Sequence, residues 1–578
     1  MPLNSLAAHF NRNKAECMTS FDENHESLME TPYGNLEGIN YTVGTLLEPF
    51  HAKVALGIAY SYNTIGEFRF RPPIVVPPFS MATTKRFGRH CFPNRNYPGL
   101  KDFNEDCLFL NIFMPFDDTI PMPKNGYPVL FFIHGGMFNY GASEDLDITA
   151  IVKNYVQRGI AVVTPNYRLG PFGFFQARAR NFAYNVGLWD LEQAFKFMIL
   201  SSEYLQLDRT KITLAGVDGG AVLAELLSLR NEIRANISGL ILIGGSALTP
   251  WAMSPGVYDL SMKLAKNLGI NTADPLDIGH DLKMRPASAI FEKLEATKEL
   301  SKDGRDFIEY TPDFDREFFY YSSLKKTFYE AREIDIYIIT TRNEGSIRTS
   351  PWKQNYYSVF NERTGLRFEE QAKYTCTDFE AFVRKHFNET AQSDAILAEY
   401  NCTNATVSPF EIYNTFNGDF WFNIPTAFSA MMYAELDSNV YVTIVNTSDV
   451  GYEKFTGSKE MPSIILNEAY LFSDSNPYNL IKTKAEDELY KNTQNLLLDS
   501  IENFVKKNTS KFHKVNPYSY QKQNFDYVEI VNGEQKIETK KVFNEKLPFW
   551  RNFFRKFGFN LLNPRIDDGK DLFYFEDL

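Results

Sequence analysis

Cysteine, tryptophan and long apolar runs are scarce in this chain of 578 residues. It contains five cysteines and five tryptophans, and an odd cysteine count in a long chain does not indicate a disulfide framework. No apolar run approaches the roughly 18 residues that a membrane-spanning helix needs. We therefore expect no membrane span.

Positive charge is also in short supply. The 60 Lys and Arg residues are outnumbered by 72 Asp and Glu residues, which gives a net charge of -12. Nucleic-acid-binding proteins usually present a basic face, because phosphate contacts dominate their affinity. We therefore expect no nucleic-acid partner. The His and Cys residues show no metal-ligand spacing, and no phosphate-binding or dinucleotide loop is present, so we expect no cofactor.

A secretion signal is not visible either. The first residues, MPLNSLAAHFNRNKAE, contain neither a long apolar region nor a cleavage site. Asn-x-Ser/Thr sequons do occur, but without such a signal they carry little weight as glycosylation sites. The sequons begin at Asn40, Asn236, Asn388, Asn401, Asn404, Asn446 and Asn508.

The chain does contain ample material for a large buried core, since 44% of it is hydrophobic. Short apolar, β-branched runs alternate with segments of helical periodicity, such as Leu188–Leu200 and Ala221–Leu229. This alternation predicts an α/β fold, with a large and mostly parallel twisted sheet covered by helices on both faces. The expected strands are Pro128–His134, Ile160–Thr164, Lys211–Ala215, Gly239–Ile243, Asp335–Thr341 and Asn439–Val445.

From residue 31 onward, no linker, repeat or low-complexity block divides the chain. We expect a polar N-terminal tail over residues 1–30, a single domain over residues 31–555 and a C-terminal tail over residues 556–578. The helix-like stretch from about Pro250 to Tyr329 separates two expected core strands. It predicts a helical insertion over the end of the sheet where such folds hold their sites.

A sharp turn follows one of the expected strands. The segment Gly216-Val-Asp-Gly-Gly220 combines a tight glycine turn with a following helix, which is the pattern of a nucleophile elbow. Asp218 occupies its centre, where a serine hydrolase carries the nucleophile. Gly135 and Gly136 follow another strand, and their amides together with that of Gly219 predict an oxyanion hole. An ordinary glycine loop is the competing interpretation.

Other motifs follow along the chain, namely Glu105-Asp-Cys-Leu-Phe-Leu-Asn111, Asn166-Tyr-Arg-Leu-Gly170, Asn185-Val-Gly-Leu-Trp-Asp190 and Phe549-Trp550. In this order they resemble motifs of the type-B carboxylesterase and cholinesterase family. The resemblance spans roughly residues 31–555. It implies an α/β-hydrolase fold with a deep gorge above the elbow.

The resemblance also implies a catalytic triad of serine, glutamate and histidine in that chain order. Asp218 stands at the serine position, Glu344 matches the acid, and Ile465 stands at the histidine position. No His occurs between positions 386 and 513. A serine hydroxyl becomes a nucleophile only when an imidazole takes its proton. With both positions changed, we predict a catalytically deficient, cholinesterase-like member of the family.

We expect this protein to act without catalysis, by binding a protein partner or a small hydrophobic ligand. Family members without the triad serve as adhesion proteins or receptors, and the resemblance leaves a homodimer open. The alternative is a carboxylic-ester hydrolase or single-turnover scavenger that uses Asp218 as an unusual nucleophile. A structural or storage role is the third interpretation. At a helix N-terminus, the Asp218 carboxylate could itself fill the oxyanion hole.

The cysteines bear on the cellular compartment. Secreted members of the family usually carry three disulfides, and Cys91 and Cys107 match the first pair. The positions of the other two pairs hold no cysteine. This favours a reducing compartment, so we predict a cytoplasmic protein in which Cys91 and Cys107 are either bonded or free, with secretion by an unrecognised route left open. Cys376 and Cys402 are expected to be small buried hydrophobic residues.

Overall fold

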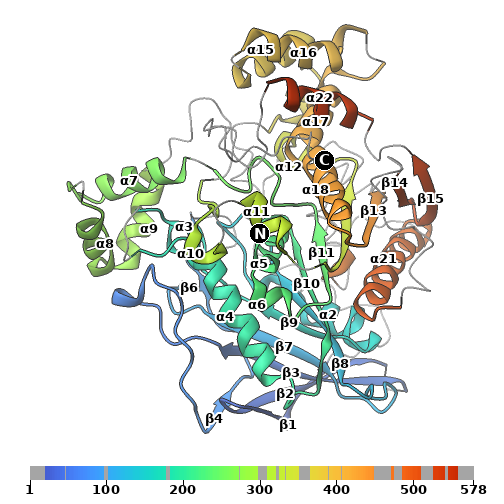
Figure 1. The fold of residues 1–578 in the computed structure, drawn as a ribbon. Helices are drawn as coiled ribbons and strands as arrows, with labels where there is room; N and C mark the ends of the chain where they lie inside the picture. Colours follow the sequence, from blue (N-terminus) through green and yellow to red (C-terminus); the bar gives the residue numbers. More distant parts are fainter. Residues whose placement is uncertain are drawn as a thin grey trace.

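The protein is organised around one large twisted sheet surrounded by helices (Figure 1). The computed structural model describes residues 20–557 apart from 46, 95, 97–101, 178–181, 255, 273, 297–308, 321–323, 332, 351–364, 388, 405, 448–469, 474–483, 509–524 and 541–544. The sheet has 13 strands in the order β1-β2-β3-β7-β9-β8-β10-β11-β12-β13-β14-β15, with β4 (Met81–Thr83) beside β2.

The centre of the sheet is parallel and its N-terminal part is antiparallel. Strands β9, β8, β10, β11, β12, β13 and β14 pair in parallel, whereas β1, β2, β3, β7 and β9 pair antiparallel in succession. The parallel strands are β8 (Tyr127–Ile133), β9 (Ala161–Pro165), β10 (Leu207–Val217), β11 (Gly239–Ile243), β12 (Asp335–Thr341), β13 (Val440–Asn446) and β14 (Phe525–Val531). The others are β1 (Ser20–Thr31), β2 (Gly34–Gly44), β3 (Pro49–Ala59), β7 (Phe109–Pro115) and β15 (Glu534–Lys540). The mostly parallel α/β sheet expected from the sequence is confirmed.

The burial of the central strands explains why they were visible in the sequence. Every residue of β8, β9 and β11 is buried, as expected for strands covered on both faces. Such strands read as continuous apolar runs and contrast with β2, in which buried and half-buried residues mix. The core of the protein therefore lies along the parallel centre of the sheet.

Residues 20–30, which were expected to belong to an irregular tail, instead form most of strand β1. This strand pairs antiparallel with β2, with a register shift between Asp22 and Glu26. Met29 is buried in the core, whereas Leu28 is 49% exposed. An edge strand pairs through its backbone and needs few apolar side chains, so polar composition concealed it.

The helical insertion lies between β11 and β12, as predicted, and its helices α7, α8 and α9 appear at the left of Figure 1. Its helices are α7 (Val257–Asn267), α8 (Pro275–Met284), α9 (Ala287–Ala296), α10 (Arg316–Phe319) and α11 (Leu324–Tyr329). A second helical group, seen at the top of Figure 1, contains α15 (Cys376–His386), α16 (Thr390–Glu399), α17 (Pro409–Gly418) and α22 (Leu547–Phe557). Within the residues described, no helix is both long and apolar enough to cross a bilayer.

Two disulfides join the four cysteines that the structure describes. One links Cys91 to Cys107, and the other links Cys376 to Cys402. The expectation that Cys376 and Cys402 are merely buried hydrophobic residues is therefore wrong. The expectation of a cytoplasmic protein is wrong with it, because disulfides persist in oxidising compartments and are rare in the cytosol. That expectation counted only the positions of the family pattern, and the second pair lies outside them.

Candidate functional site

Asp218 lies at the sharp turn between a central strand and a buried helix. Strand β10 ends at Val217, and α5 (Gly219–Ser228) begins at the next residue but one. The backbone of Asp218 has a φ of 55° and a ψ of -123°, a conformation that costs energy for any residue except glycine. The turn therefore holds its central side chain in a strained and defined position.

Two glycines make this turn sterically feasible. A Cβ atom on Gly216 would lie 2.2 Å from the carbonyl oxygen of Gly220. A Cβ atom on Gly220 would lie 2.3 Å from the carbonyl oxygen of Ile133, at the end of β8. Only glycine fits where two backbones come this close. Gly216 and Gly220 therefore allow the strand, the turn and the helix to pack against one another.

The Asp218 side chain is buried and bonded to the loop that follows β8. Its Oδ2 atom accepts hydrogen bonds from the backbone amides of Gly136, at 3.0 Å, and Met137, at 2.8 Å. Its Oδ1 atom has no hydrogen-bond partner among the residues that the structure describes. One carboxylate oxygen is thus tied to two amides, while the other is buried without a bond.

The donors at this position differ from those named from the sequence. Gly136 donates to Asp218, and Met137, which the sequence reasoning missed, is the second donor. Gly136 and Met137 both have positive φ values, of 107° and 50°, so the loop turns consecutive amides toward the elbow. Any residue after the two glycines could supply such an amide, so its identity carried no signal.

The surroundings of the elbow bring the pKa of Asp218 close to neutral pH. Burial, together with the nearby negative charge of Glu344, raises the pKa of Asp218 to about 7. The amide of the adjacent Gly219, which lies outside hydrogen-bond geometry, and the bonded amides of Met137 and Gly136 lower the pKa, since they favour the ionised carboxylate. At neutral pH the ionised and protonated forms of Asp218 are therefore both populated.

Glu344 follows strand β12 and is also buried. Its Oε1 atom accepts hydrogen bonds from the Thr341 amide at 2.8 Å and the Thr341 hydroxyl at 2.9 Å. The hydroxyl of Thr340 lies within hydrogen-bond distance of Glu344 Oε1, at 3.2 Å, and of Asn423 Oδ1, at 3.1 Å. The end of its own strand thus anchors Glu344. Ile465, the residue predicted at the histidine position, lies outside the described residues.

His134 is the histidine closest in sequence to the loop amides. Its Nδ1 atom lies 2.8 Å from the carbonyl oxygen of Gly135, and its ring stacks on Tyr167. Burial lowers the pKa of His134 to about 4, so the ring is neutral at physiological pH. Within the described part of the chain, no imidazole forms a hydrogen bond with Asp218.

Comparison of the sequence with known proteins assigns the chain to a family. A model of the carboxylesterase family matches residues 25–550. The chain belongs to the carboxylesterase family. The α/β-hydrolase fold and the resemblance to type-B carboxylesterases predicted from the motifs are therefore confirmed.

The family relatives include both esterases and neuroligins. Gut esterase 1 of Caenorhabditis elegans is 28% identical over 296 residues, which are 50% of this chain and 49% of the esterase. Venom carboxylesterase-6 of Apis mellifera is 28% identical over 239 residues, 40% of this chain and 42% of the relative. Neuroligin-1 of C. elegans is 32% identical over 243 residues, 37% and 30% respectively. The chain thus spans about half or less of the length of these curated relatives.

These relatives also bear on the compartment. One carries the name of a venom protein, which agrees with the two disulfides and not with the predicted cytoplasmic location.

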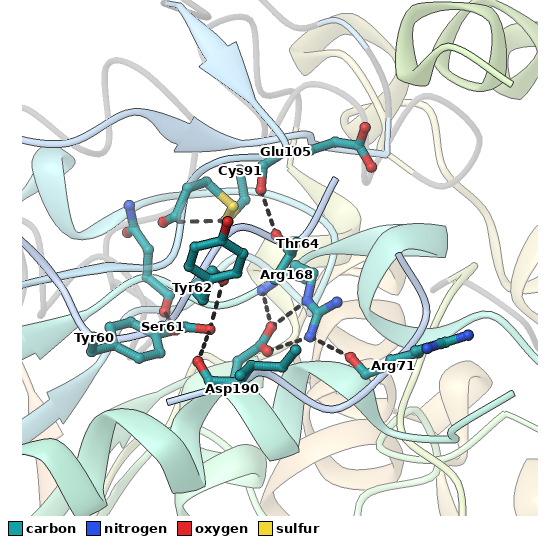
Figure 2. A network of polar contacts seen from close by, with 12 residues as sticks. Tyr60, Ser61, Tyr62, Thr64, Arg71, Cys91, Glu105, Arg168 and Asp190 are labelled. Atoms are coloured by element: carbon teal, nitrogen blue, oxygen red, sulfur yellow. Dashed lines mark hydrogen bonds and ion pairs between the residues drawn. A yellow bond between two sulfur atoms is a disulfide. The ribbon is translucent and has the colours of Figure 1, made fainter. Parts of the chain in front are cut away.

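The sequence motifs that resemble those of the carboxylesterase family mostly stabilise the loops of this protein. Arg168 donates from Nε and Nη2 to the two carboxylate oxygens of Asp190, at 2.8 and 2.6 Å, and both residues are buried. Figure 2 shows this pair and the further bond from Arg168 to the carbonyl oxygen of Arg71, at 2.8 Å. Similarly, Glu105 forms a buried ion pair with Arg69. These motif residues position segments of chain and contribute no group to the elbow.

Buried carboxylates such as Asp218 and Glu344 could in other surroundings serve as metal ligands. Within the described residues, no cluster of His, Cys, Asp and Glu side chains could hold a metal ion.

Proposed function

We propose that this member of the carboxylesterase family acts by binding and does not hydrolyse esters. The observation that carries the proposal is the pair of hydrogen bonds from Gly136 and Met137 to Asp218. Backbone amides at this place in α/β-hydrolases stabilise the oxyanion that develops on a substrate carbonyl. A substrate would have to displace the protein's own carboxylate from them.

The surroundings of Asp218 in the described part of the chain support the same proposal. Asp218 receives no hydrogen bond from an imidazole in the described residues. Ile465, at the predicted histidine position, has a side chain that cannot accept a proton. If Asp218 attacked an alkyl substrate, the alkyl ester formed would persist unless a base activated the water that cleaves it, and no described imidazole is bonded to Asp218. Glu344 then serves as a hydrogen-bonding group that organises the end of β12.

The bound molecule that we favour is a protein partner. Neuroligins are among the relatives of this chain, and family members without the triad serve as adhesion proteins or receptors. A small hydrophobic ligand in the gorge implied by the family resemblance is the alternative, and the same resemblance leaves a homodimer open. Cross-linking in native material, followed by binding measurements with the purified candidate partner, separates these cases. Saturable binding of a small ligand without a protein partner would favour the alternative.

The direct test of the proposal is an esterase assay on the purified full chain. We expect no turnover of short p-nitrophenyl esters above the rate measured for the Asp218→Asn variant. We also expect Asp218→Ser to remain inactive, because a serine there still lacks a general base. Turnover in the wild-type protein that Asp218→Asn abolishes would overturn the proposal.

A mass measurement tests the single-turnover alternative. The protein is incubated with alkyl halides and epoxides, which a nucleophilic carboxylate would alkylate. We expect no adduct at Asp218 by intact mass and peptide mapping. A stoichiometric adduct that is absent from Asp218→Asn would instead identify a scavenger.

A further inference from the structure

The surface loop between α16 and α17 carries the sequon Asn401-Cys402-Thr403. Asn401 and Thr403 are exposed, whereas Cys402 is half-buried and bonded to Cys376. From the sequence alone this sequon carried little weight. The disulfide changes that assessment, because disulfides and N-linked glycans are both formed in the oxidising lumen of the secretory pathway.

We propose that Asn401 is modified with an N-linked glycan. The Thr403 hydroxyl donates to Asn401 Oδ1 at 3.0 Å, and Asn401 Nδ2 makes no hydrogen bond to any residue that the structure describes. The nitrogen that would carry the sugar is therefore on an exposed side chain and has no bond to lose. A bulky, hydrophilic group at this position requires no rearrangement of the fold.

The modification replaces one hydrogen on the side-chain amide. Asn401 Nδ2 forms a bond with the anomeric carbon of an oligosaccharide donated by a lipid diphosphate carrier. The bond between that carbon and the lipid diphosphate breaks, and the nitrogen gives up one proton. The reaction involves no oxidation or reduction, and the carboxamide of Asn401 stays neutral.

Three other sequons, at Asn40, Asn446 and Asn236, offer poorer acceptors. Asn40 lies within β2, between β1 and β3, and its Oδ1 atom is buried. Asn446 ends β13, and its Nδ2 atom donates to Glu529 at 3.4 Å. Asn236 is half-buried and donates to the carbonyl oxygen of Glu232 at 2.7 Å. The structure thus distinguishes the exposed sequon at Asn401 from these three, which are engaged in packing or hydrogen bonds.

A glycopeptide map of the protein purified from its native source tests the proposal. The glycans are released with peptide N-glycosidase in water labelled with heavy oxygen, which converts each glycosylated Asn into a labelled Asp. We expect the label at Asn401, none at Asn40 or Asn446, and less at Asn236 than at Asn401. Complete recovery of the Asn401 peptide in its unmodified form would overturn the proposal.

A pair of variants at Thr403 provides the matched control. Thr403→Ala destroys this sequon without altering Asn401 or Cys402, whereas Thr403→Ser preserves it. In a host that secretes the wild-type protein, we expect the first variant to lose the glycan mass at Asn401 and the second to retain it. Equal glycan mass in both variants would contradict the assignment. A non-reducing peptide map that finds the Cys376–Cys402 bond in each variant excludes misfolding as the cause.

Discussion

Two buried carboxylates in this protein, Asp190 and Asp218, have opposite surroundings. Asp190 receives three hydrogen bonds from Arg168, two of them from the cationic guanidinium. Asp218 receives two backbone amides on one oxygen, and its other oxygen is unbonded within the described residues. A cation makes the first carboxylate a structural anchor, whereas the pKa of the second is raised to about 7. The difference shows that burial alone does not decide what a carboxylate does.

The largest effect is expected from breaking the Asp190 pair. Arg168→Ala leaves a negative charge buried without its cation, which typically costs about 3–5 kcal/mol. We expect the free energy of unfolding, measured by urea denaturation, to fall by that amount. Arg384→Ala is the control, because it breaks a solvent-exposed ion pair with Asp394 and should change stability far less. Similar losses of stability for both variants would contradict the expected difference between the buried and the exposed ion pair.

The next effect concerns the pH dependence that Asp218 contributes. Its pKa in the folded protein is about 7, compared with an ordinary value of 3.8. Between these values the folded protein holds one more proton than the unfolded chain, so stability decreases as pH rises. We expect wild-type stability to fall relative to Asp218→Asn by roughly 1.4 kcal/mol per pH unit from about pH 4 to 7.

Above about pH 7 this difference should level off, because Asp218 is then ionised in both states. Urea denaturation of both proteins at a series of pH values measures it. A difference that stays constant across the window would show that Asp218 is ionised throughout, as a cation-paired carboxylate would be.

A smaller loss of stability is expected from the loop that bonds Asp218. Gly136 has a φ of 107°, and a Cβ atom there would lie 2.2 Å from the carbonyl oxygen of Tyr140. Gly136→Ala should therefore cost about 1–3 kcal/mol and displace the amide from Asp218. Gly269→Ala is the matched control, since Gly269 also has positive φ but has open space around it. Equal losses would mean that backbone strain alone explains the effect.

The smallest expected effect is electrostatic. Glu344→Gln removes the negative charge that raises the pKa of Asp218, although burial remains the main cause of that raised pKa. The upper end of the pH window in which wild-type stability falls should therefore move to slightly lower pH. The measurement is the same pH series of urea denaturation, compared with Asp218→Asn in the Glu344→Gln background. An upward movement would contradict a repulsive interaction between the two carboxylates.

Several features were predictable because their physical cause is local. Strands β11 and β12 coincide with the predicted runs, since a strand buried on both faces must be apolar along its whole length. The elbow was recognisable because the close approach of two backbones at Gly216 and Gly220 excludes every other residue. In contrast, polar strand β1 depends on pairing with β2 and left no periodic signal.

The sequence by itself determined the fold family, the core strands and the presence of a carboxylate at the centre of the elbow. Only the tertiary structure decided what that carboxylate contacts, that Met137 supplies an amide, and that Cys376 pairs with Cys402. The physical reason is that backbone amides look alike in a sequence, and cysteine pairing depends on which segments the fold brings together. Local residue chemistry set the available groups, and long-range packing determined their partners.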